Sequence, residues 1–80
     1  MALEMFKMVT LQEDIPEYKL RRGDVATIVE HHPTSDEDGY SLEVFNAIGE
    51  TIAVVTVAES QIKLLTANQV LHARVLEEAV

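Results

Sequence analysis

The sequence predicts a small all-β domain, because short segments of strand-forming residues recur along it and turn-forming residues separate them. The residues that favour strands are concentrated in four segments, residues 5–11, 25–31, 40–45 and 51–57. Gly23-Asp24 and the polar residues 33–39 and 46–50 supply turns between these segments. Since 80 residues correspond to one domain rather than two, we expect a single domain over residues 1–80.

A long polar loop, residues 12–24, follows the first expected strand. The apolar side chains of Ile15, Tyr18 and Leu20 recur among its charged residues, and we expect them to anchor the loop. Pro16 has a fixed φ and favours an extended conformation at the residue before it. The loop is therefore expected to start in extended geometry.

The expected strand 40–45 alternates between apolar and polar residues. Its pattern predicts that Tyr40, Leu42 and Val44 face the core, whereas Ser41 and Glu43 face outward. Both faces of the expected strand 51–57 are instead largely apolar, although a lone small barrel should present one face to water. We therefore expect its outer face to be covered, by the C-terminal segment or by a second copy in a homodimer. The predicted core residues are Val29, Leu42, Val44 and either Val54 or Val55.

The last quarter of the chain begins with a predicted single helical turn, residues 58–61, and a short fifth strand, residues 62–65. The segment after it is ambiguous. We favour a short helix capped by Asn68, with its apolar residues Val70, Leu71, Val75 and Ala79 near one face; the alternative is an edge strand over residues 70–75. In all, the pattern predicts an SH3-like barrel of about five short strands with a 3-10 turn before the last barrel strand. The barrel core spans about residues 5–65, and the C-terminal extension spans residues 66–80.

Acidic residues are concentrated in the middle of the chain, whose formal net charge is −8. Residues 36–59 hold six acidic and no basic side chains, whereas residues 1–35 sum to −2 and residues 60–80 sum to zero. Such a surface repels nucleic acid, whose binding depends on Lys and Arg, and attracts a basic protein. The candidate partner-binding residues are Asp36, Glu37, Asp38, Glu43 and Tyr18.

The residue types that carry common enzyme chemistry are missing or scattered. The chain has no cysteine, so it can form neither a disulfide nor a thiolate metal site. Its three glycines are far apart and form no phosphate-binding loop, and its serines show no arrangement typical of a catalytic triad. We therefore expect no enzyme activity, no catalytic residue and no cofactor.

The adjacent histidines His31 and His32 do not predict a metal site. On a strand they point to opposite faces, whereas zinc needs three or four converging ligands. The acidic loop that follows does not fit a calcium loop, because Phe45 would stand where a bidentate Glu is required. We expect no metal, although a small metal- or ligand-binding domain around these histidines is retained as an alternative.

The segment from Ile15 to Val29, together with Gly49-Glu50-Thr51, resembles a family of small bacterial proteins classified as domain of unknown function 4926. The resemblance covers about residues 5–65. It implies an SH3-like barrel related in shape to KOW-type modules, and it implies no activity and no functional residues. Ala26 departs from the family pattern, in which we expect Gly.

These observations predict a non-catalytic protein-interaction module, an acidic accessory, immunity or antitoxin-like partner of another bacterial protein. Its expected partner is a basic protein, or a second copy in a homodimer. The alternative is a KOW-like nucleic-acid or ribosome-associated module that uses Lys7, Lys19, Arg21 and Arg22. The longest apolar run, residues 52–55, is far shorter than a membrane span. With no signal peptide expected, a cytoplasmic protein without membrane association is predicted.

Overall fold

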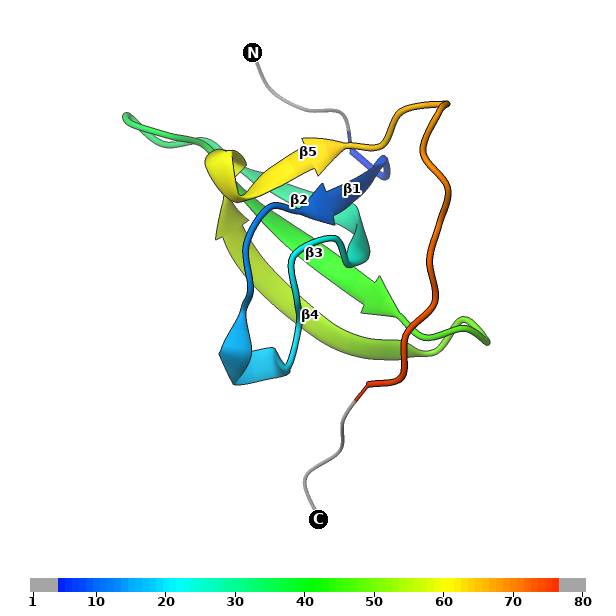
Figure 1. Cartoon of the computed structure of the whole chain (residues 1–80). Helices are drawn as coiled ribbons and strands as arrows, with labels where there is room; N and C mark the ends of the chain where they lie inside the picture. Colours follow the sequence, from blue (N-terminus) through cyan, green and yellow to red (C-terminus); the bar gives the residue numbers. More distant parts are fainter. Residues whose placement is uncertain (1–4, 77–80) are drawn as a thin grey trace.

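The computed structural model describes residues 5–76 and contains one five-stranded antiparallel sheet (Figure 1). The strands are β1 (Met8–Leu11), β2 (Val25–His32), β3 (Gly39–Phe45), β4 (Thr51–Ala58) and β5 (Ile62–Leu64). Two 3-10 turns, η1 (Pro16–Tyr18) and η2 (Glu59–Gln61), complete the elements. The prediction of an all-β domain with five strands and a turn before the last strand is confirmed. The first strand is shorter than predicted, because Phe6 has a φ of +62°, in the left-handed region that ends regular strand geometry.

The strand order in the sheet is β4-β3-β2-β1-β5. Although η2 connects β4 directly to β5, the last strand pairs with β1, so β4 and β5 form the two edges. The sheet curls around a single core to which all five strands contribute. Its fully buried large side chains are Tyr40, Leu11, Ile28, Leu42 and Val9. The further assignment of this curled sheet to the SH3-like barrels remains a prediction.

The predicted core is confirmed at three positions and wrong at one. Leu42, Val44 and Val55 are buried, and so is Tyr40, as the alternation of β3 predicted. Ser41, which was expected to face outward, is also buried, in hydrogen-bond contact with His32 and Thr56.

Val29 is only half-buried, because Ala26 and Ile28 supply the core side chains of β2 and the residue after Ile28 points to the opposite face. Val29 is also the extra residue of a β-bulge, where the pairing of β2 with β3 passes from Ile28 directly to the residue after Val29. The bulge shifts the alternation only beyond this point, where His31 lies opposite the buried Tyr40.

The C-terminal segment is neither the helix nor the edge strand expected from the sequence. Residues 65–76 form a turn near residues 67–68 and then an extended strap that runs beside the sheet and passes the loop between β3 and β4 (Figure 1). Val70 and Val75 are about nine-tenths exposed, at 91% and 89%. These two side chains therefore pack against little of the described structure, whereas a short helix is stabilised mainly by packing of its apolar face. Ala79, which was expected on that helix, lies outside the described residues.

Candidate functional site

Charge is separated along the strand order of the sheet. Residues 23–62, which form β2, β3, β4 and η2, contain no Lys or Arg, and their eight acidic residues are Asp24, Glu30, Asp36, Glu37, Asp38, Glu43, Glu50 and Glu59. All six basic residues lie in the flanking segments, which include β1 and β5. Because β4 and β5 are opposite edges of the sheet, the negative charge lies towards the β4 edge.

The loop between β2 and β3 holds its carboxylates in place by local hydrogen bonds. The Thr34 hydroxyl donates to the carbonyl oxygen of Glu37 at 2.7 Å, and the Thr34 N–H donates to Asp38 Oδ1 at 3.4 Å. His31 Nε2 lies 2.8 Å from Asp38 Oδ2. The hydrogen bond with His31, reinforced by that from Thr34, lowers the pKa of Asp38 below its usual range. Asp38 is therefore ionised throughout the neutral range.

The turn η2 adds a fourth carboxylate to this loop. Ser60 Oγ donates to Glu37 Oε1 at 2.9 Å, and the Glu59 N–H donates to the Asp38 carbonyl oxygen at 2.9 Å. The buried Tyr40 hydroxyl donates to Glu59 Oε1, also at 2.9 Å, which orients that carboxylate. We call this cluster, formed by Asp36, Glu37, Asp38 and Glu59, the acidic end.

The structure brings together three of the five predicted partner-binding residues. Asp36, Glu37 and Asp38 lie in the acidic end, whereas Glu43 lies farther along β3, opposite Val54, and accepts a hydrogen bond from Thr51 Oγ1 at 2.5 Å. Tyr18 belongs to η1, in the loop between β1 and β2, and is exposed. Glu59 was not predicted. It could have been predicted from the expected hairpin of β3 and β4. That hairpin pairs Gly39 with Ala58 and therefore places Glu59, the next residue, beside the loop between β2 and β3.

The two histidines point to different partners, as adjacent residues of a strand should. The His31 ring stacks on Tyr40 with centroids 5.0 Å apart, whereas His32 Nε2 lies 2.7 Å from Ser41 Oγ. Within residues 5–76 no three His, Asp or Glu side chains are grouped so that they could hold a metal ion. His31 and His32 thus take part in the hydrogen bonding and packing of the β2–β3 hairpin.

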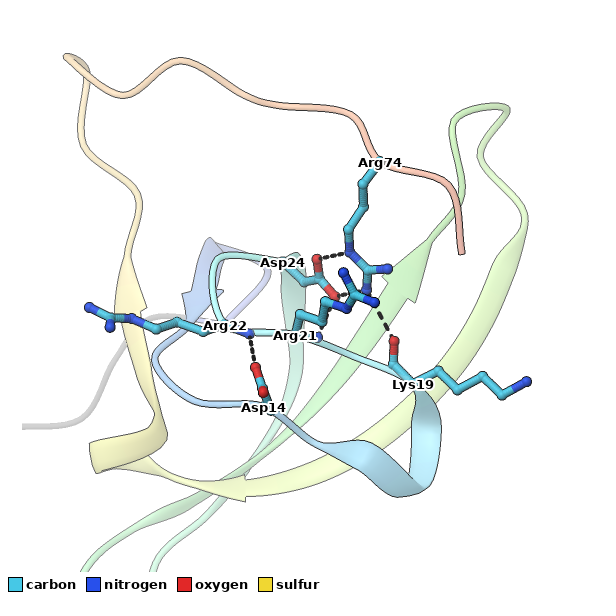
Figure 2. Close-up of polar contacts among 6 residues, drawn as sticks. All are labelled: Asp14, Lys19, Arg21, Arg22, Asp24 and Arg74. Atoms are coloured by element: carbon cyan, nitrogen blue, oxygen red, sulfur yellow. Dashed lines mark hydrogen bonds and ion pairs between the residues drawn. The ribbon is translucent and has the colours of Figure 1, made fainter. Parts of the chain in front are cut away.

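The strap is attached to the loop before β2 by an arginine. Figure 2 shows the Arg74 guanidinium against the Asp24 carboxylate, with Nε donating to Oδ1 at 2.8 Å, Nη2 donating to Oδ2 at 2.5 Å and Nη2 also donating to the Lys19 carbonyl oxygen at 3.1 Å. The Arg21 N–H donates to Asp24 Oδ2 at 2.8 Å. Partial burial by itself raises the pKa of Asp24, but the hydrogen bonds from Arg74 and Arg21 and the positive charges of both arginines lower it overall.

A cleft of about 570 Å³ lies between the strap and the end of the sheet where β3 ends and β4 begins. Its apolar lining includes Leu20, Val44, Phe45, Ile52 and Leu71, and Asp24 and Arg74 also line it. The cleft is open to solvent on one side, and its lining is mainly apolar. The Arg74–Asp24 contact thus fixes one side of this cleft.

The fold and the surface define a small all-β domain with its charge separated across one sheet. The chain belongs to the family described as Domain of unknown function (DUF4926), whose model matches residues 5–64. This match confirms the family indicated by the sequence, and it ends at the last residue of β5, so the strap lies beyond it. No curated protein and no solved structure gave a significant match. Among the described residues, no helix is long and apolar enough to cross a membrane.

Proposed function

We propose that the chain is an acidic protein-interaction module that binds a basic protein through the β4 side of its sheet and the acidic end. The observation that supports this most strongly is the confinement of all the excess negative charge to residues 23–62, without a Lys or Arg among them. A one-signed surface of this kind speeds the encounter with an oppositely charged partner. In the cell, the module would act in the cytoplasm as an accessory, immunity or antitoxin-like partner.

The acidic end suits this role because its carboxylates are already positioned before a partner arrives. The carboxylates of Glu37, Asp38 and Glu59 are each held by a hydrogen bond with a neighbouring side chain. These neighbours are Ser60, His31 and Tyr40, respectively. Fixed side chains lose less conformational entropy on binding than mobile ones do. Asp36 makes no side-chain hydrogen bond within the described residues, and its carboxylate is exposed to incoming Lys or Arg.

The test is affinity capture from the lysate of the source cells by three forms of the full chain. The first is the natural sequence. The acidic-end variant carries Asp36→Asn, Glu37→Gln and Asp38→Asn, and the control variant carries Glu13→Gln, Asp14→Asn and Glu17→Gln in the loop between β1 and β2. Both variants remove three negative charges and keep amide oxygens that can accept hydrogen bonds. The control therefore separates the location of the charges from their number.

We expect the natural chain and the control variant to capture the same basic protein at low salt, and the acidic-end variant to capture much less of it. High salt should release it, because exposed charges are screened over about 10 Å at 0.1 M salt. Equal capture by both variants would contradict the acidic end as the contact surface. Capture of RNA and ribosomal proteins would instead favour the nucleic-acid alternative.

A further inference from the structure

The free edge of β4 is long and uncharged. Its eight residues, Thr51–Ala58, include no charged residue, no Pro and no Gly. Within residues 5–76, only β3 pairs with this strand, so its second edge carries unpaired backbone groups. Such an edge is a template for an additional strand, and proteins ordinarily block it with charges, prolines or short strand length.

The opposite edge of the same sheet provides an internal comparison. β5 has only three residues, Ile62–Leu64, and its middle residue is Lys63. A short strand with a lysine is a common protection against edge-to-edge pairing. In the described part of the chain, one edge of the sheet is thus protected and the other is open.

The outer face of β4 adds apolar surface beside this edge. Ile52 is 40% exposed and Val54 is 54% exposed, on the face that the sequence led us to expect to be covered. The strap lies at the Ile52 end of the strand, where Ile52 lines the same cleft as Leu71 and Leu76. It leaves Val54 exposed, so the described part of the strap does not cover this face.

The net charge of the chain indicates that a strand pairing with the β4 edge comes from a basic protein and not from a second copy of the chain. Two copies would each carry −8. An antiparallel pairing centred on Val54, which preserves the inward and outward faces, would place Glu50 of one copy opposite Ala58 of the other, next to its Glu59. Such a pairing brings two acidic edges together, and the net like charge of the two copies opposes their association. A basic strand would instead be attracted by Glu50 and Glu59, which flank β4, and by Glu43, which lies one strand further in, on β3 opposite Val54.

We infer that the β4 edge binds an extended segment of a basic protein, in which apolar residues alternate with Lys or Arg, as a sixth strand of the sheet. Backbone hydrogen bonds along the edge would supply affinity, and the alternating side chains would supply specificity. The inference rests on the proposed function and specifies how the basic partner binds.

The experiment titrates the ¹⁵N-labelled full chain with a capped eight-residue peptide that alternates Lys and Val. A second peptide of the same sequence is N-methylated at two adjacent central residues. Because the N–H groups of successive residues in a strand point to opposite edges, this blocks backbone hydrogen bonding on both edges of the peptide. We expect the unmethylated peptide to shift the β4 amides and slow their exchange, without such changes in β5. The methylated peptide should bind at least about tenfold more weakly.

A protein variant tests the same edge from the other side. Val54→Lys places a charge on β4, whereas the control Ile48→Lys places the same charge on the exposed turn between β3 and β4. We expect Val54→Lys to weaken the unmethylated peptide about tenfold and Ile48→Lys to weaken it less than about threefold. Equal effects of the two variants would overturn strand addition at β4.

Three further outcomes would overturn the inference, and each leaves a different account standing. If both peptides bind equally well and the acidic-end variant binds both more weakly, the chain is an acidic interaction module that does not bind by strand addition. If neither peptide binds while lysate capture still depends on the acidic end, the proposed function holds and its mode of binding is different. Concentration-dependent dimerisation that shifts the β4 amides would assign the edge to a second copy.

Discussion

Replacing Leu42 by Ala should be among the most damaging single changes in the domain. Leu42 is 0% exposed on β3, between Ile28 of β2 and Val55 of β4, which are its cross-strand partners. The substitution removes three carbons, worth about 2–2.5 kcal/mol at roughly 0.8 kcal/mol per methylene. A cavity term adds to this, because hydrogen-bonded strands on both sides limit how far the core can collapse. The expected loss is about 3–4 kcal/mol, within the range of roughly 2–5 kcal/mol for buried Leu→Ala changes.

This loss is large relative to the whole stability of the domain. A chain of this length is stable by about 4–12 kcal/mol, at roughly 0.05–0.15 kcal/mol per residue. Each kcal/mol shifts the Tm of a domain this small by about 4–8 °C, so Leu42→Ala should lower it by more than about 10 °C. Urea unfolding followed by circular dichroism would give the free energy directly.

The matched control is Val54→Ala on the adjacent strand. Val54 points outward from β4 and is half-exposed, so its truncation should cost less than about 1 kcal/mol. A loss below about 1 kcal/mol for Leu42→Ala, or equal losses for the two variants, would refute the assignment of faces on β3 and β4. An intermediate loss for Val29→Ala is expected because its side chain is half-buried.

Three other predictions concern the strap, acid stability and one turn. Arg74→Gln should increase the backbone mobility of residues 70–76, measured by ¹⁵N relaxation, with little change in Tm, because a partly exposed ion pair contributes only about 0–1 kcal/mol; unchanged relaxation would show that the strap is held by other contacts. Since the pKa of Asp24 is lowered in the folded state, its contribution is present above the unfolded value of about 4 and is lost as the pH falls through the folded value. Asp24→Asn should therefore flatten the loss of stability in this acid range, as pH-dependent urea unfolding would measure, and a curve identical to that of the natural chain would contradict the reasoning. Gly49→Ala should cost about 1–2 kcal/mol in urea unfolding, because Gly49 has a φ of +84° with open space around it, so that only backbone strain opposes the new methyl group; an unchanged midpoint would contradict this.

Local pattern was sufficient for much of the fold. The alternation of β3 correctly predicted which of its apolar side chains enter the core, and turn residues correctly separated the strands. Val29 was misplaced because both faces of the β2 segment carry apolar residues, so its pattern does not reveal that Ala26 and Ile28, and not Val29, face the core. The strap was misread for a different reason. Its position depends on Arg74 reaching Asp24, fifty residues earlier, whereas helical periodicity considers only near neighbours.

The candidate site was predictable in charge and only partly in geometry. The excess of acid in the middle of the chain is visible in the sequence, and Asp36, Glu37 and Asp38 follow from it. Glu59 joins them only because the long hairpin of β3 and β4 brings η2 back to the loop before β3. Glu43 and Tyr18 were grouped with these acids by sequence alone, and the fold places both outside the acidic end.

The most direct test of the account is the association rate of the natural chain with the protein it captures, measured by stopped-flow fluorescence over a range of salt concentrations. Electrostatic steering predicts that the rate falls steeply, by about tenfold or more, between low and high salt. The fall should be much smaller for the acidic-end variant and nearly unchanged for the control variant. An association rate that does not depend on salt, or that depends on it equally in all three forms, would contradict recognition of a basic partner by the β4 side of the sheet and the acidic end.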